Sequence, residues 1–168
     1  GKAGISRFGK TAGSYKPFIV DGKQLPFETP LNDIFGQEKI PGEVKAMAAY
    51  KGKLVLAMSN ANDGAIAVLD AQSAKLLKNI PTKKATGLAV SKDGKFYAIL
   101  GDKLNAVNLE SGSTTELKVA GVGTMTAIGV DPDGNIAVLD TGADSQVKVY
   151  SPAGKLAYTC GKKGGRPI

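Results

Sequence analysis

A repeat of about forty residues constrains the fold of this chain more than any other feature. Residues 49–57, 89–98 and 129–138 are similar to one another, and each contains one glycine at the matching position, Gly52, Gly94 or Gly134. These glycines are 42 and 40 residues apart. That period is the length of one four-stranded blade of a β-propeller.

The pattern inside each repeat predicts strands. The glycine supplies the positive φ that a tight hairpin turn requires, and Asp93 and Asp133 just before it favour the same turn. Short apolar runs rich in Val, Ile, Leu and Tyr lie between polar and glycine-rich segments, which is typical of buried antiparallel strands. The predicted strands are 87–90, 96–100, 104–109 and 117–120 in the second repeat, and 126–130, 136–139, 147–150 and 156–160 in the third.

The chain therefore divides into blades. We expect an all-β fold with full blades of four antiparallel strands at residues 42–83, 84–122 and 123–168, the last ending in a basic connecting tail. Residues 1–41 are expected to hold the end of a preceding blade and an irregular segment, because Pro26, Pro30 and Pro41 disfavour four full strands there. Since closed propellers have about four to eight blades, this interpretation predicts a part of a larger propeller.

The third repeat resembles the NHL-repeat family of β-propellers. The resemblance is carried by Ile128–Tyr150, with Asp131, Gly134, Asp140 and Asp144, and by the glycines and lysines of residues 154–164. It covers residues 126–165 closely and about 120 residues loosely. It implies a propeller architecture, but members of this family range from enzymes to RNA-binding and protein-binding scaffolds, so it does not fix the function.

The composition excludes several chemistries. The chain has no histidine, so it holds no serine-histidine-acid triad, histidine general base, histidine-bound zinc or histidine haem ligand. Its one cysteine, Cys160, has no partner for an intramolecular disulfide and is expected to be a small buried side chain. The sequence contains no stretch of 18 apolar residues, so it predicts no membrane-spanning helix.

The net charge of +7 comes from the two ends of the chain. Residues 18–154 are close to neutral, whereas both ends carry basic residues without acids. One hypothesis is an anion-binding or partner-binding surface for RNA or another polyanion, and the other is a solvated connection between blades. The candidate residues are Arg7, Lys10, Lys16, Lys162, Lys163 and Arg166.

A second candidate site lies in the loops between the second and third strands of the blades. Carboxylate and amide oxygens there have the chemistry that calcium prefers. The same side chains also commonly cap their own backbone turns, so we expect no cofactor, with calcium as the alternative. The candidate metal ligands are Asn60, Asn62, Asp63, Asp140 and Asp144.

The resemblance also bears on catalysis. Enzymes of similar propellers use histidine-bound zinc, which is excluded, or a calcium in the central funnel held by Glu, Asn and Asp. We expect none of the glutamates to begin an inner strand, where the funnel is lined, and we assign no catalytic residue. The glutamates are Glu28, Glu38, Glu43, Glu110 and Glu116.

The favoured function is a non-catalytic scaffold that binds a protein partner or further blades of the same assembly. The alternatives are an RNA-binding or polyanion-binding propeller that uses the basic termini, and a calcium-dependent hydrolase or lactonase. The glycine-rich, cysteine-poor repeats favour a secreted or periplasmic protein.

Overall fold

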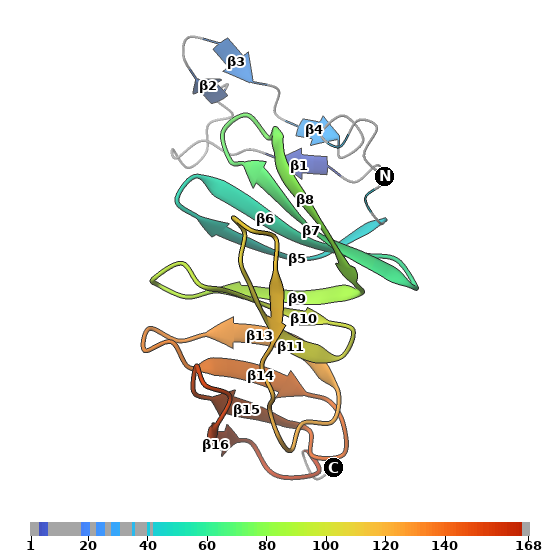
Figure 1. Ribbon diagram of the computed structural model, residues 1–168, viewed down its shortest axis with the longest axis vertical. Helices are drawn as coiled ribbons and strands as arrows, with labels where there is room; N and C mark the ends of the chain where they lie inside the picture. Colours follow the sequence, from blue (N-terminus) through green and yellow to red (C-terminus); the bar gives the residue numbers. More distant parts are fainter. Residues whose placement is uncertain are drawn as a thin grey trace.

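The computed structural model describes residues 4–6, 18–20, 23–25, 28–30, 35, 40 and 42–165. In this part of the chain, three four-stranded antiparallel sheets follow one another along the long axis of the molecule (Figure 1). The strands of each sheet lie in chain order, so each sheet is a simple meander. The prediction of an all-β fold built from four-stranded propeller blades is confirmed.

Each sheet occupies one repeat. The first contains β5 (Glu43–Tyr50), β6 (Lys53–Ser59), β7 (Asp63–Asp70) and β8 (Leu76–Lys83). The second contains β9 (Ala85–Val90), β10 (Phe96–Leu100), β11 (Lys103–Val107) and β12 (Thr114–Glu116). The third contains β13 (Met125–Val130), β14 (Ile136–Asp140), β15 (Gln146–Tyr150) and β16 (Leu156–Cys160).

Before residue 42 the described strands are short. β1 (Gly4–Ser6) pairs with β4 (Glu28–Pro30), and β2 (Phe18–Val20) pairs with β3 (Lys23–Leu25). These two-stranded sheets lie beyond the first four-stranded sheet, at the end of the molecule opposite the C-terminus (Figure 1). Pro30 is the last residue of β4, as expected for a residue without a backbone N–H.

The turns that open the second and third sheets follow one design. The backbone N–H of Ser91 donates to the carbonyl of Lys95, and the N–H of Gly94 donates to the carbonyl of Ser91. Asp131, Gly134 and Asn135 repeat both bonds in the third sheet. Gly94 and Gly134 both have a φ of 86°, a conformation that a side chain disfavours. The spacing of the glycines therefore marks the turns, as predicted.

The fourth strand of the second sheet differs from its prediction. The sequence indicated residues 117–120, but β12 covers Thr114–Glu116. After the N–H of Leu117 donates to Leu104, the chain leaves the second sheet for the third. There the carbonyl of Ala120 accepts a 2.9 Å bond from the Tyr150 hydroxyl, and Leu117 and Val119 pack in the cluster that contains Tyr150. This run is a bridge between sheets, because Leu117 and Val119 are half-buried against the third sheet.

The core lies between the sheets. One cluster joins the first and second sheets and includes Val55, Ile66 and Phe96. Another joins the second and third sheets and includes Ile99 and Ile136. A third cluster lies on the other face of the first sheet. Its buried members are Phe35, Leu56, Met58, Ala67 and Leu69. Both sheets are therefore apolar on both faces, and they are covered on both faces except along β5 of the first sheet. This pattern is typical of stacked propeller blades.

The first strands of neighbouring sheets lie side by side, β5 next to β9 and β9 next to β13. These strands form the inner edge of the stack, and the later strands of each sheet extend outward from it. This is the arrangement of blades around a propeller axis.

Gly94 and Gly52 are a matched pair of turn glycines that tests the contact between Gly94 and the Tyr50 ring. Both have positive φ, so alanine at either position costs about 1 kcal/mol of backbone strain. A Cβ on Gly94 would also lie 2.5 Å from Cε1 of Tyr50, whereas a Cβ on Gly52 would meet nothing within 4 Å. We expect Gly94→Ala to lower the free energy of unfolding by roughly 1–3 kcal/mol more than Gly52→Ala. Urea denaturation measures the difference, and equal losses would contradict the Tyr50 contact.

Candidate functional site

One of the predicted metal ligands of the first sheet, Asn60, caps a backbone turn. Asn60 Oδ1 accepts hydrogen bonds from the backbone N–H groups of Asn62 and Asp63, at 2.8 and 2.7 Å. The Asn60 amide oxygen is therefore engaged in the loop between β6 and β7. The side chains of Asn60, Asn62 and Asp63 lie at the surface.

The predicted ligands of the third sheet surround a lysine. Lys148 Nζ lies 2.7 Å from Asp140 Oδ2 and 2.7 Å from Asp144 Oδ2, and it also donates to the carbonyl of Gly121. Asp140 is buried and accepts three backbone bonds of 2.9 to 3.1 Å from Gly123, Thr124 and Gly142. The ammonium thus occupies the space between the two carboxylates, where a cation would bind.

The charges of this network hold one another in their ionised forms. The Lys148 ammonium, helped by the surrounding backbone N–H groups, holds the pKa of the Asp140 carboxyl well below its ordinary value. Lys148 also lowers the pKa of Asp144. In return, Asp140 and then Asp144 raise the pKa of Lys148. Because Gly121, Gly123 and Thr124 belong to the segment that enters the third sheet, this network fixes that segment to the loop between β14 and β15.

The five oxygen-bearing candidates belong to two separate sheets, Asn60, Asn62 and Asp63 to the first and Asp140 and Asp144 to the third. Among the residues that the structure describes, no group of three or more acidic, histidine or cysteine side chains is placed to hold a metal ion. The calcium interpretation stays a prediction and needs the direct test given below.

The basic candidates are only partly described. Arg7, Lys10, Lys16 and Arg166 lie outside the described residues. Lys162 and Lys163 are exposed, and Lys163 Nζ lies 3.4 Å from Asp144 Oδ1. The tail that carries these two lysines folds against the third sheet, because the N–H of Gly164 donates to the carbonyl of Asp144 and Gln146 Nε2 donates to the carbonyl of Gly161.

Two further sequence expectations were wrong. Glu43 is the first residue of the inner strand β5, where we expected no glutamate, and it pairs with Lys45. Cys160 is exposed instead of buried, because it lies at the end of the outermost strand of the third sheet. In the described part of the chain, no helix has the length and apolar character needed to cross a membrane.

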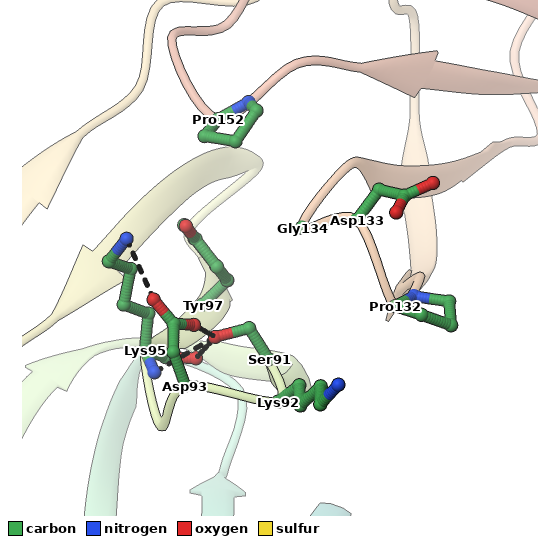
Figure 2. Close-up of a pocket in the computed structure, with 9 residues that line it drawn as sticks. All are labelled: Ser91, Lys92, Asp93, Lys95, Tyr97, Pro132, Asp133, Gly134 and Pro152. Carbon is green, nitrogen blue, oxygen red and sulfur yellow. Dashed lines mark hydrogen bonds and ion pairs between the residues drawn. The ribbon is translucent and has the colours of Figure 1, made fainter.

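A cavity of about 440 Å³ opens between the turns of the second and third sheets. Figure 2 shows the turn that contains Ser91, Asp93 and Lys95 facing Gly134 and Pro152 of the third sheet. Asp93 pairs with Lys95 at 2.9 Å and accepts a bond from Ser91, which, with Lys95, lowers its pKa to about 2. The groove is lined by two lysines, Lys92 and Lys95, and two aspartates, Asp93 and Asp133. Their charges balance, so the groove does not favour a charged ligand.

The face of the third sheet that points away from the second sheet is the main feature that sequence reasoning missed. We call it the outer face of the third sheet. The strand registers place only uncharged side chains on it, all of them apolar except the cysteine thiol and the tyrosine hydroxyl. Its members are Ala127, Gly129, Ala137, Leu139, Val147, Val149, Tyr158 and Cys160.

The corresponding faces of the other two sheets are covered. Tyr97 and Ile99 occupy the positions of Ala137 and Leu139 relative to the turn glycine, and they pack against the third sheet with 4% and 0% of their surface exposed. Leu139 is 40% exposed and Tyr158 is 53% exposed. A Cβ on Gly129 would meet nothing within 4 Å. Val149 on the same face is buried. The outer face of the third sheet thus has the composition of a blade interface, and no blade in the described part of the chain covers Leu139 or Tyr158.

A signal for this face was present in the sequence. The third repeat keeps apolar residues at successive positions of its strands, such as Ile136–Leu139, as expected for a sheet covered on both faces. The sequence pattern alone does not say which side is covered.

Lys148 offers a test of the charge network. Lys148→Met would leave two carboxylates, one of them buried, without their cation, and we expect a loss of roughly 3–5 kcal/mol in the free energy of unfolding. Lys162→Met is the control, because Lys162 is an exposed lysine next to the same loop. Urea denaturation of both variants gives the comparison. Equal stability of the two variants would show that the network contributes nothing.

The same network predicts a pH dependence. Asp140 and Asp144 have lowered pKa values, so their contribution to stability is complete above the ordinary value of 3.8 and is lost as the pH falls below it. Lys148 has a raised pKa, so its contribution is complete below 10.5 and is lost as the pH rises beyond its folded-state pKa. We expect the difference in melting temperature between wild type and Lys148→Met to narrow from pH 6 to pH 2. A constant difference would contradict the assignment.

Calcium can be tested directly on the wild-type chain. Because Lys148 lies between Asp140 and Asp144, we expect millimolar calcium to shift the melting temperature by less than about 1 °C. A bound ion would stabilise the fold by mass action, by about 2.7 kcal/mol at a hundred times its dissociation constant. A shift of several degrees with calcium, absent with magnesium, would support the calcium interpretation.

Solved structures similar to this chain are propeller-like. PorZ, described as a bacterial surface component of the type-IX secretion system of Porphyromonas gingivalis, has a TM-score of 0.59 at 16% identity and covers 83% of this chain and 19% of its own. Hydrazine synthase of Kuenenia stuttgartiensis has a TM-score of 0.57 at 17% identity, covering 77% of this chain and 40% of its own. Regucalcin of Agrobacterium tumefaciens, described as a calcium-binding protein, has a TM-score of 0.51 at 19% identity. The match covers 67% of this chain and 43% of regucalcin.

These likenesses concern the fold alone, since each identity is below 20%. The chain spans between a fifth and about two fifths of the length of these structures. The comparison with curated protein sequences finds no match. The NHL-repeat resemblance stays a prediction. A family model described as a domain of unknown function (DUF5074) matches residues 18–151, and the chain belongs to that family.

Proposed function

We propose that this protein is a non-catalytic β-propeller module that binds another protein through the outer face of its third sheet. The single observation that carries the proposal is the contrast between this face and its counterparts. Leu139 of β14 is 40% exposed, whereas Ile99, at the matching position of β10 in the second sheet, is fully buried. Contiguous exposed apolar surface on a soluble protein marks an interaction site.

The chemistry of the face also favours a protein partner. It carries no charged side chain, so a partner can cover it without burying an unpaired charge. Aromatic and aliphatic side chains such as Tyr158 and Leu139 are the kind that contribute most to protein interfaces. A nucleic acid would require a basic surface instead.

The other two candidate functions have weaker support. Polyanion binding through Lys162 and Lys163 competes with the ion pair between Lys163 and Asp144. A calcium-dependent hydrolase would need cation ligands that Lys148 does not already engage. The similar structures include proteins with different functions, and a shared fold does not select among them. A secreted or periplasmic location remains part of the proposal.

Site-specific photo-crosslinking tests the proposed binding surface. A photoreactive benzoylphenylalanine at position 158 would replace an aromatic side chain of the outer face, and the same residue at position 155 is a control on an exposed turn of the same sheet. We expect illumination of cells that make the protein to give a discrete protein adduct from position 158 and none from position 155. Equal adducts from both positions, or none from position 158, would contradict the proposal.

A further inference from the structure

The exposed apolar side chains gather at the two ends of the stack of sheets. Among the described residues, every large hydrophobic side chain that is exposed belongs to the first or the third sheet, and the second sheet contributes none. These residues are Val44, Met47, Leu77, Leu139, Leu156 and Tyr158. The middle sheet contributes no such side chain, the third sheet has open apolar surface on its outer face, and the first sheet is open mainly along its inner strand.

The open surface of the first sheet lies on its inner strand. Val44, Met47 and Ala49 of β5 lie on the face that points away from the second sheet, since Met47 pairs with Leu56 and Ala49 pairs with Leu54. We call these three residues the β5 stripe. The rest of that face is covered by packing around Leu56 and Phe35. Met47 is nevertheless 63% exposed.

We propose that the partner is a second copy of this chain, joined head to tail. In this arrangement the outer face of the third sheet of one copy packs against the β5 stripe of the other copy, and the reciprocal contact closes the ring. This inference rests on the proposed function, because it names the protein that covers the same face. The arrangement continues the order in which the sheets of one chain stack, with the inner strand of each sheet beside the inner strand of the next.

The contact continues two interfaces that already exist within the chain. β9 lies beside β5, and β13 lies beside β9, so the next inner strand in the series would lie beside β13. The β5 of a second copy is an inner strand with exposed apolar side chains on the side that would face it. Two copies supply six four-stranded sheets, a number within the four to eight blades of known propellers.

The mass of the full chain in solution tests the proposal. Sedimentation under reducing conditions is expected to give about 35 kDa, twice the 17.3 kDa of the chain, at micromolar concentration. Leu139→Lys and Met47→Lys are each expected to shift the species to the single-chain mass. Leu77→Lys is the control, because Leu77 is exposed on β8 outside both surfaces, and it is expected to remain a dimer.

Mixing the two variants distinguishes head-to-tail closure from a symmetric contact. Leu139→Lys keeps an intact β5 stripe and Met47→Lys keeps an intact outer face, so an equimolar mixture retains one intact contact and is expected to recover dimer. If the outer faces of two copies met each other, Met47→Lys alone would remain dimeric and the mixture would recover nothing further, which would overturn the proposal. Circular dichroism melts check that each variant is folded.

A second measurement does not depend on the variants. Cys160 lies on the outer face and is exposed in the single chain, so its reaction rate with a thiol reagent is expected to rise on dilution by tenfold or more. A concentration-independent rate together with a single-chain mass would overturn the proposal. If photo-crosslinking at position 158 then captured a different protein, the proposed binding function would stand and the second-copy inference alone would fail.

Discussion

Each sheet in this protein has apolar side chains on both faces, and the rest of the structure depends on covering them. The strands β6, β7 and β10 are buried almost without interruption, which requires neighbours on both sides of a sheet. The hydrophobic effect therefore favours stacking of successive repeats, because a single blade leaves one or both faces in water. The stacking in turn places the inner strands side by side and leaves apolar side chains exposed on the outer face of the third sheet and along the β5 stripe.

Polar interactions set the geometry of the stack and contribute less to the drive for stacking. The charge network around Lys148 connects the loop after β14 to the segment that enters the third sheet. Tyr150 does the same through its bond to Ala120. Both lie at the junction where the chain passes from one sheet to the next. The side chains that looked like metal ligands thus position a connection between blades.

The repeat allowed the architecture to be predicted, and the reasons lie in particular residues. Gly94 and Gly134 need positive φ in tight turns, so their spacing in the sequence gave the blade period. The strand predicted at 136–139 corresponds to β14, Ile136–Asp140. The strand predicted at 117–120 was wrong because an apolar run is buried equally well by a strand or by a bridge that packs on the next sheet.

The site was harder to predict than the fold. Asp140 and Asp144 were predicted as candidate metal ligands, but nothing in their spacing showed that Lys148 would lie between them. The outer face of the third sheet was missed because apolar periodicity shows which side chains seek burial and does not show what covers them. Cys160 was expected to be buried because a lone thiol is commonly a small core side chain, but it lies at the exposed end of β16.

Hydroxyl-radical footprinting across a dilution series tests the central claim, that the outer face of the third sheet is a blade interface that no described part of the chain covers. At the lowest concentration, the account predicts rapid modification of Leu139 and Tyr158, with Tyr97 and Ile99 protected. With rising concentration, protection should increase at Leu139, Tyr158 and Met47. If Leu139 and Tyr158 were as protected as Tyr97 and Ile99 at every dilution, the face would be covered within a single chain and the account would be contradicted.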